Sequence, residues 1–186
     1  TRTNLKVFDQ KAGKTTEINE SGAEVSPENL KAFNEKFRNL CKNADVAVVS
    51  GSLPPGVPKD FYAQCITAAK AENVKTILDA DGEALAEGLK AIPYAVKPNI
   101  HELEALLGRE LKTPKDVLAA AREFIAKGIA IVIVSMGPDG ALVADANEAY
   151  KVDSWDIEVK SATGAGDSMV GSLAYSIVRG DSLADI

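Results

Sequence analysis

Few residues of this 186-residue sequence suit thiol redox chemistry or transition-metal binding, because it has only two cysteines and one histidine. Cys41 and Cys65 lie on separate apolar helical patterns and form no Cys-x-x-Cys or Cys/His spacing. We interpret both as small buried side chains of a reduced compartment. His101 has no serine, cysteine or metal partner visible in the sequence, so a place on a helix surface or in packing explains it better than catalysis.

Long apolar runs are lacking as well. No run is long enough to span a bilayer, and the sequence does not start with a charged and then apolar leader. The formal net charge is −6, whereas a nucleic-acid-binding protein normally presents a basic face. We therefore expect a cytoplasmic protein with neither a membrane nor a nucleic acid among its partners.

Two common nucleotide-binding motifs are missing. The sequence contains neither Gly-x-x-x-x-Gly-Lys-Ser/Thr nor Gly-x-Gly-x-x-Gly. The first cradles phosphates in P-loop enzymes, and the second marks dinucleotide-binding domains. Both classes are therefore disfavoured.

What the sequence does contain is a repeated alternation of short apolar strands with amphipathic helices. Strands of the continuous, buried type are predicted over residues 45–50, 76–78, 94–96 and 129–135. Such strands between helices indicate a mostly parallel sheet covered on both faces, and the length favours one domain. Residues 3–19 are different, since they have the pattern of a β-hairpin. Ser26 and Thr113 stand where helix N-caps are expected.

Polar residues and glycines gather where the predicted strands end. They occur in four short segments: Ser50-Gly51-Ser52, Asp79, Lys97-Pro98-Asn99 and Ser135-Met136-Gly137. In open parallel sheets, ligands bind outside the carboxyl ends of the strands. We therefore expect these four segments to share one crevice with residues 164–167.

Residues 163–169, Thr-Gly-Ala-Gly-Asp-Ser-Met, lead into an apolar helical pattern that ends at Arg179. Each glycine in a helix costs about 1 kcal/mol relative to alanine, so helix stability alone does not explain Gly164 and Gly166. Bare N–H groups at the positive end of a helix dipole attract an anion. Asp167 is placed to take a proton from an attacking hydroxyl while these N–H groups stabilise a transferred phosphoryl group.

Structural explanations are open for several of these residues. Asp167 and Asp79 can be ordinary helix caps, and Asn99 with Glu102 can form an N-cap with a returning acidic side chain. A calcium loop starting at Asp79 fails, because alanine and lysine stand at its sixth and twelfth positions, where glycine and glutamate are needed.

Three segments together resemble motifs of the ribokinase-like (PfkB-type) sugar kinases. They are Ser-Gly-Ser-Leu-Pro-Pro-Gly at 50–56, Val-Lys-Pro-Asn-Ile-His-Glu-Leu at 96–103 and Gly-Ala-Gly-Asp-Ser at 164–168. Residues 1–7 and 16–20 are similar to the phosphosugar branch of that family. The resemblance covers essentially the whole chain. It implies a ribokinase-like three-layer α/β sandwich with a mostly parallel sheet, here an incomplete fragment with part of the family's β lid.

The resemblance also implies phosphoryl transfer from ATP to a sugar hydroxyl, with Mg²⁺ as the second cofactor. Asp167 matches the catalytic base of the family, and Gly164, Ala165 and Gly166 match its anion hole. Five further residues match positions at the nucleotide: Lys97, Asn99, Ser135, Gly137 and Gly140.

Four residues match positions nearer to the metal and the sugar. Glu102 and Asp79 match acidic positions on the metal side, with Asp79 acting through water. Arg2 and Ser52 match positions that face the phosphosugar, and an arginine fork suits phosphate recognition. Residues 162–163, Ala-Thr, depart from the Thr-Val that relatives usually have, so no nucleotide contact is carried over there.

The resemblance divides the chain into a lid-associated hairpin, residues 1–20, and an α/β core, residues 21–186. It implies that N-terminal and C-terminal parts of the family's domain are missing, and that a second copy pairs through the lid. The expected reaction converts fructose 1-phosphate to fructose 1,6-bisphosphate. Tagatose 6-phosphate and fructose 6-phosphate are alternative substrates, and a non-catalytic binding protein on the same fold is an alternative of another class.

Overall fold

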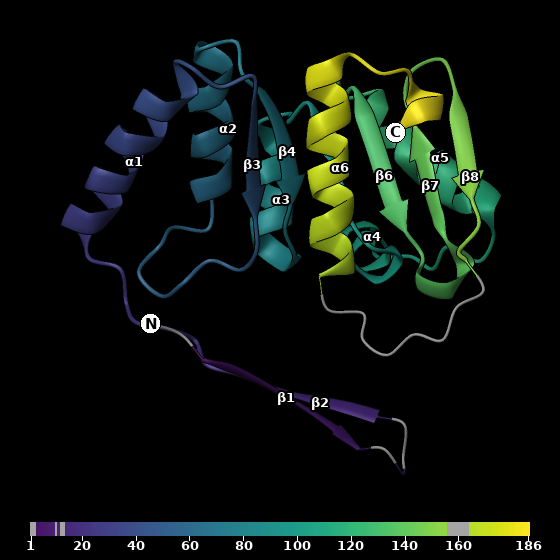
Figure 1. Ribbon diagram of the computed structural model, residues 1–186, viewed down its shortest axis with the longest axis horizontal. Coiled ribbons are helices and arrows are strands. Elements are labelled where there is room, and N and C mark those ends of the chain that lie inside the picture. The colour runs from purple at the N-terminus through teal and green to yellow at the C-terminus, as the bar shows by residue number, and fades with distance from the viewer. Residues whose placement is uncertain (1–2, 10, 12–13, 156–163) are drawn as a thin grey trace.

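A two-stranded hairpin projects from an α/β body in the computed structural model, which describes residues 3–9, 11, 14–155 and 164–186 (Figure 1). The antiparallel strands β1 (Asn4–Asp9) and β2 (Lys14–Asn19) form the hairpin, as the pattern over residues 3–19 predicted. Glu20 closes its base. The Thr3 N–H donates to the Glu20 carboxylate at 2.9 Å, and the Glu20 N–H donates to the Thr3 carbonyl at 3.2 Å.

The body is built on a six-stranded sheet with the strand order β3-β4-β5-β6-β7-β8. Its strands are β3 (Val46–Ser50), β4 (Lys75–Asp79), β5 (Ala95–Val96), β6 (Ile131–Ser135), β7 (Ala141–Ala144) and β8 (Ala149–Val152). Neighbouring strands from β3 to β6 are parallel, whereas β7 and β8 are each antiparallel to the strand before them. The turn η1 (Gly137–Asp139) lies between β6 and β7. The mostly parallel sheet is therefore confirmed.

Helices cover both faces of this sheet, so the body has three layers (Figure 1). They are α1 (Pro27–Cys41), α2 (Phe61–Ala71), α3 (Gly82–Lys90), α4 (Ile100–Leu107), α5 (Pro114–Ile125) and α6 (Ala165–Arg179), followed by the short turn η2 (Leu183–Asp185). The α6 helix lies on one face, and α2 to α5 lie on the other, with α1 packed outside α2. The expected α/β sandwich is confirmed.

Two apolar clusters fill the spaces between these layers. Side chains alternate across a strand, so consecutive residues of β4 enter different clusters. Ile77 packs with Leu173 and Ile177 of α6, whereas Leu78 packs with the helices on the opposite face. Ile77 and Leu78 are both fully buried. Continuous apolar strands were therefore a correct sign of a sheet covered on both sides.

Two of the helices begin at the caps that the sequence indicated. The Ser26 hydroxyl accepts a hydrogen bond from the Asn29 N–H at 3.2 Å at the start of α1. The Thr113 hydroxyl accepts one from the Asp116 N–H at 3.3 Å, and the Asp116 carboxylate accepts one from the Thr113 N–H at 2.9 Å. A proline follows each cap, where its fixed φ suits the first helical turn.

The carboxyl ends of the parallel strands and the first turn of α6 lie at the same edge of the body. The hairpin projects on that side (Figure 1). The opposite edge holds the ends of the helix-to-strand connections and the last residues of α6. This topology gathers the strand-end residues on the side of the body where the hairpin projects (Figure 1).

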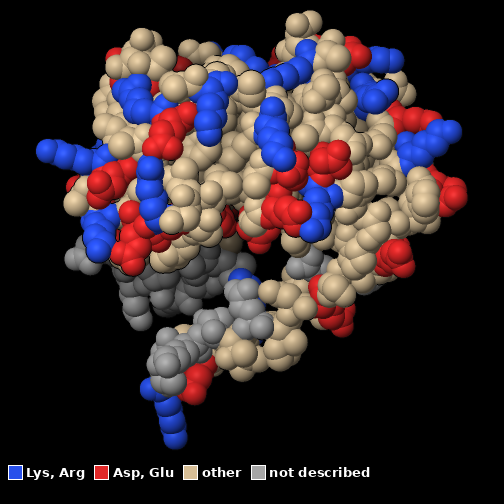
Figure 2. Space-filling model, turned by 180° about the vertical axis from the view of Figure 1, so that it is seen from behind, with Lys and Arg blue, Asp and Glu red and all other residues tan. Residues whose placement is uncertain are grey.

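Acidic and basic side chains are interspersed over the body when it is seen from behind (Figure 2). Within the residues that the structure describes, none of the helices combines the length and the hydropathy that crossing a bilayer requires.

Candidate active site

An ion pair between two consecutive strand ends lies at the centre of the strand-end residues. Asp79 ends β4, and Lys97 directly follows β5. Lys97 Nζ lies 3.0 Å from Asp79 Oδ1, and the exposed fractions of the two side chains are only 6% and 17%. The backbone fixes this arrangement, because the Lys97 N–H donates to the Leu78 carbonyl at 3.1 Å. A nearly buried lysine therefore carries its charge at the carboxyl edge of the sheet.

The first turn of α6 lies beside this lysine. A Cβ atom built on Gly166 would lie 3.5 Å from Lys97 Nζ. Gly164 caps the helix with φ +83°, in the left-handed region that favours glycine. The N–H groups of a first helical turn have no carbonyl partner within their own helix. An ammonium group and the positive end of a helix dipole therefore meet at one point, which suits an anion.

Asp167 lies in this first turn as the third residue of α6, and it is exposed. The alternative that Asp167 is the N-cap is wrong, because Gly164 holds that position. Gly164, in a left-handed conformation, directly precedes the first turn, so the helix begins three residues earlier than it would if Asp167 were the cap. The exposed carboxylate of Asp167, beside the start of the helix, is accessible to a hydroxyl of a bound ligand.

Asn99 and Glu102 form a capping box at the start of α4. Asn99 Oδ1 accepts from the Glu102 N–H at 2.9 Å, and Glu102 Oε2 accepts from the Asn99 N–H at 2.8 Å. The structural explanation for this pair is thus confirmed. Burial raises the pKa of Glu102, while the Asn99 N–H and then the Lys97 charge oppose the rise, and the Asp79 and Asp81 charges add to it. The charges of both members of the central ion pair therefore act on Glu102.

The other structural alternative, that Asp79 caps a helix, is wrong. Asp79 is the last residue of β4, and the cap position of α3 belongs to Asp81. The carboxylate of Asp79 instead accepts from Lys97 and, at 3.4 Å, from the Ser50 hydroxyl. Three strand ends are linked through this one side chain.

Ser135 ends β6, and Gly137 and Gly140 belong to the turn that follows it. The Ser135 N–H donates to the Pro98 carbonyl at 3.1 Å, and Ser135 forms an isolated parallel bridge with Asn99. Gly137 has φ +60° with open space where a Cβ would be. Gly140 has φ +83°, and its Cβ would lie 1.9 Å from the Val152 carbonyl oxygen. Backbone packing against the end of β8 is therefore sufficient to require glycine at 140.

Ser52 lies beside the base of the hairpin. It is exposed in the loop after β3, and it lines a hollow of about 490 Å³ together with Asn19 and Glu20. The loop also carries Gly51, whose N–H donates to the Asp79 carbonyl at 3.0 Å. Ser52 is thus linked through its neighbour to the central ion pair and faces the space between the body and the hairpin.

These contacts bring most of the predicted residues together at the carboxyl ends of the parallel strands, but two predictions lie outside the described residues. They concern Arg2 and the Ala162-Thr163 pair. Sequence reasoning missed Tyr62. Its hydroxyl donates to the Ser50 and Gly51 carbonyls at 2.9 and 3.0 Å. No spacing in the sequence signals this contact, because it depends on how α2 packs against β3.

Histidine and cysteine lie as the sequence indicated. His101 is exposed on α4, with Nδ1 3.6 Å from Glu104 Oε2. Cys41 and Cys65 are buried free thiols. Burial raises the pKa of both, that of Cys65 to about 11. Neither thiol is therefore placed or activated for chemistry at neutral pH.

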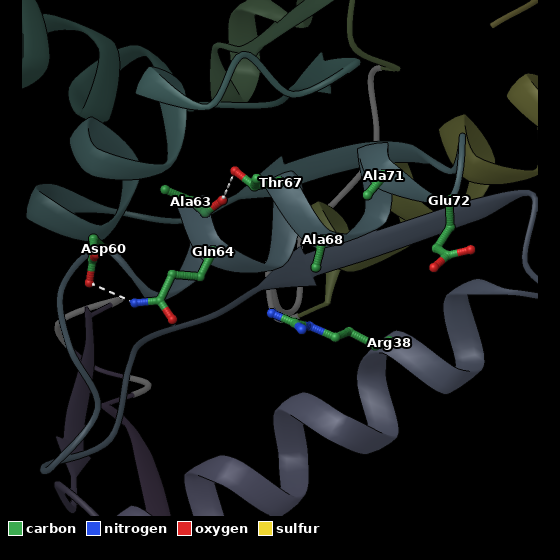
Figure 3. Close-up of a pocket in the computed structure, with 8 residues that line it drawn as sticks. All are labelled: Arg38, Asp60, Ala63, Gln64, Thr67, Ala68, Ala71 and Glu72. Atoms are coloured by element: carbon green, nitrogen blue, oxygen red, sulfur yellow. Dashed lines mark hydrogen bonds between the residues drawn. The ribbon is translucent and has the colours of Figure 1, made fainter.

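A separate groove of about 600 Å³ lies between α1 and α2 (Figure 3). Arg38 reaches into it from α1, and α2 lines it mainly with small side chains, among them Ala63, Ala68 and Ala71. Asp60 accepts a hydrogen bond from Gln64 at 3.2 Å at one end of the groove. None of the strand-end residues lines it. The groove is therefore not part of the candidate site.

Comparison with known proteins identifies the family. The sequence profile described as pfkB family carbohydrate kinase matches residues 1–186. The chain belongs to the pfkB family of carbohydrate kinases. Among curated relatives, 1-phosphofructokinase of Escherichia coli strain K12 is 40% identical over 182 residues, which are 98% of this chain and 58% of that protein.

Solved structures of this family have the same fold. Phosphofructokinase-2 from Escherichia coli, crystallised in complex with substrates and products, is 37% identical, with a TM-score of 0.90 over 97% of this chain and 59% of its own. The same enzyme in complex with fructose-6-phosphate is also 37% identical, with a TM-score of 0.88 and the same coverage. The chain thus spans about 58% of the length of the curated relatives it matches.

Proposed function

We propose that this chain is the greater part of an ATP-dependent phosphosugar kinase, and that the longer protein containing it phosphorylates fructose 1-phosphate to fructose 1,6-bisphosphate. One observation carries the proposal. In a chain of the pfkB family, the nearly buried Lys97 pairs with a carboxylate, Asp79, and lies beside the start of α6, where Asp167 lies. Cations, anion-binding N–H groups and a proton acceptor are the parts that phosphoryl transfer needs.

The residues of the site have distinct proposed roles. Asp167 takes the proton of the sugar hydroxyl that attacks the terminal phosphate of ATP. The N–H groups of Gly164, Ala165 and Gly166 hold the transferred phosphoryl group at the start of α6. Lys97 neutralises phosphate charge beside it. Because Lys97 is held by backbone and by burial, little reorganisation is needed when the phosphates arrive.

Five residues are proposed to bind the nucleotide. Lys97 and Asn99 lie toward its phosphates, and the turn of Ser135, Gly137 and Gly140 lies beside Asn99. The bridge between Ser135 and Asn99 makes one continuous surface of the two segments.

The acidic residues fit a magnesium ion that is bound together with ATP. The described residues contain no group of three or more His, Cys, Asp or Glu side chains that could hold a metal alone. Mg²⁺ is usually bound by one or two carboxylates, with phosphate oxygens and water completing the shell. Asp79 and Glu102 would hold it in that way, with Asp79 acting through water. When bound, the ion would supply charge neutralisation on the phosphates.

The substrate proposal rests on sequence identity. Fructose 1-phosphate is preferred because the 40% identity to the Escherichia coli 1-phosphofructokinase covers nearly the whole chain. Fructose 6-phosphate is the second candidate, since a solved relative with a TM-score of 0.88 binds it. In either case Ser52, with Arg2 of the N-terminal residues, is proposed to face the phosphosugar.

The hairpin is proposed to act as part of a lid, with residues 1–20 as a lid segment and residues 21–186 as the core. Leu5, Val7 and Ile18 lie on one face of it, because Leu5 pairs with Ile18 and Val7 is two residues away. Their exposed fractions are 53%, 49% and 58%. A second copy of the protein, pairing through the lid in the cytoplasm, is the proposed partner that covers them.

The decisive experiment is an ADP-release assay on the full-length protein that contains this chain. Fructose 1-phosphate, fructose 6-phosphate and tagatose 6-phosphate are compared side by side, with an Asp167→Asn variant. We expect a preference for fructose 1-phosphate and a loss of about 10²-fold or more in turnover for the variant. Asp45→Asn is the matched control. Asp45 is exposed and directly precedes β3, at the end of the strands opposite to the candidate site.

Each other result changes a different part of the proposal. Unchanged turnover in Asp167→Asn would remove Asp167 from the chemistry. Turnover that depends on Asp167 but favours fructose 6-phosphate would keep the mechanism and replace the substrate. ATP binding without turnover of any sugar would favour a non-catalytic binding protein.

A further inference from the structure

The loop from Ser50 to Val57 is fixed at both ends by contacts to different parts of the protein. At its start, the Gly51 N–H donates to the Asp79 carbonyl at 3.0 Å. At its end, the Pro55 carbonyl accepts from the Val25 N–H at 2.8 Å. A Cβ on Gly56 would lie 2.5 Å from the Val25 carbonyl oxygen, so the segment after the hairpin runs directly against the loop. Ser52 lies between these two anchors.

One side chain completes the anchoring at the start of the loop. Tyr62 lies in the first turn of α2, and only 7% of its surface is exposed. Its one hydroxyl proton is shared between the carbonyl oxygens of Ser50 and Gly51, which lie 2.9 and 3.0 Å from the phenol oxygen. Both carbonyls directly precede Ser52, and Gly51 has φ +93°, where the chain turns. The phenol therefore fixes the peptide orientation from which the Ser52 side chain emerges.

The chemistry of Tyr62 suits this role. Burial raises its pKa, with the charges of Cys65, Asp81 and Asp79 adding to the rise. The hydroxyl therefore keeps its proton, and with it the ability to donate, throughout the neutral range. A phenylalanine would fill the same space between α2 and β3 but would leave both carbonyls without this donor.

We propose that Tyr62 is a positioning residue for phosphosugar binding, which acts by holding the Ser50 and Gly51 carbonyls so that Ser52 faces the sugar. This inference rests on the proposed function, since it needs Ser52 at the phosphosugar. It assigns a role to a residue that does not contact the substrate. It also predicts that loss of the Tyr62 hydroxyl changes the KM for the phosphosugar more than the KM for ATP.

Steady-state kinetics of the full-length protein test this inference. We expect Tyr62→Phe to raise the KM for the phosphosugar about 5- to 10-fold, the usual effect of one lost hydrogen bond, with kcat and the KM for ATP changed less than about 2-fold. Tyr94→Phe is the matched control. It also removes a phenol hydroxyl, but from a residue just before β5, at the end of the strands opposite to the candidate site. It should leave all three constants unchanged.

A double-mutant cycle with Ser52→Ala separates positioning from general stabilisation. If Tyr62 acts through Ser52, the double variant has the KM of Ser52→Ala alone. The inference would be overturned if the double variant raised the sugar KM by the product of the two single effects. Equal changes in the KM values for sugar and ATP in Tyr62→Phe would also overturn it. So would an unchanged sugar KM in Tyr62→Phe while Ser52→Ala raises it. If no phosphosugar is turned over by the unsubstituted protein, the proposed function itself has failed.

Discussion

Lys97 and Asp79 form a nearly buried ion pair although they lie at the ends of different strands. The register of the parallel pair β4 and β5 places Leu78 opposite Val96, and each charged residue is the next along the chain. Parallel strands end at the same edge, so the two charges meet there. The third participant is Gly166, which lets the start of α6 approach the ammonium group. The site thus depends on the register of the sheet and on the lack of a side chain at Gly166 in α6.

The first prediction separates the stability of α6 from the access to its first turn. Gly166→Ala should leave the protein as stable or up to about 1 kcal/mol more stable, because alanine is the better helix former. Its new methyl group, 3.5 Å from Lys97 Nζ, would nevertheless occupy the point where a phosphate is proposed to bind. We expect about 10-fold weaker ATP binding by calorimetry, the effect of roughly one displaced charge-assisted hydrogen bond.

Gly171→Ala is the control for this substitution. Gly171 lies in the same helix, and a Cβ there would meet nothing within 4 Å. We expect a comparable gain in stability with unchanged ATP binding. Equal ATP affinity in both variants would show that the first turn of α6 does not meet the phosphates.

The second prediction uses the capping boxes at the starts of α4 and α5. Asn99→Ala and Thr113→Ala should each cost about 1 kcal/mol in the free energy of unfolding, because each removes a side-chain acceptor at a helix start. Only Asn99 lies beside Lys97 and Ser135. We therefore expect weaker ATP binding in Asn99→Ala alone, measured by calorimetry alongside urea unfolding. A matching loss of affinity in Thr113→Ala would mean that Asn99 acts only through helix stability.

The sequence predicted the layers, the sheet and the edge at which the site assembles, because these follow from local patterns. Alternating apolar segments mark the strands, and Ser26 and Thr113 mark helix starts that depend on a few neighbouring residues. The contacts within the site could not be predicted in the same way. The Lys97 and Asp79 pair depends on strand register, and the reach of Tyr62 depends on the packing of α2. The Gly140 contact with Val152 depends on where β8 ends.

The third prediction concerns the turn after β6. Gly140→Ala should destabilise the protein by about 3 kcal/mol or more, since it combines a backbone region reserved for glycine with a clash against the Val152 carbonyl. Gly137→Ala, with positive φ but open space, should cost only about 1 to 2 kcal/mol. Urea unfolding of both variants measures the difference. Equal losses would mean that the end of β8 moves away at little cost.

The last prediction is a pH dependence of stability that comes from Cys65. Burial, with a smaller contribution from Cys41, raises the pKa of this thiol from an ordinary value of 9.0 to about 11. Between these values the unfolded chain has lost the proton and the folded chain retains it. The contribution to stability is therefore fully present below pH 9 and is lost as the pH rises toward 11.

Urea unfolding at pH 8 and pH 10.5 measures this effect by comparing the unsubstituted protein with Cys65→Ala. Other groups titrate in the same range, but they are common to both proteins, and the packing lost with the sulfur is the same at both pH values. We expect the unsubstituted protein to lose about 2 kcal/mol more than the variant over this interval. Identical pH slopes would mean that the folded thiol ionises as readily as the unfolded one, and that water reaches Cys65 between α1 and α2.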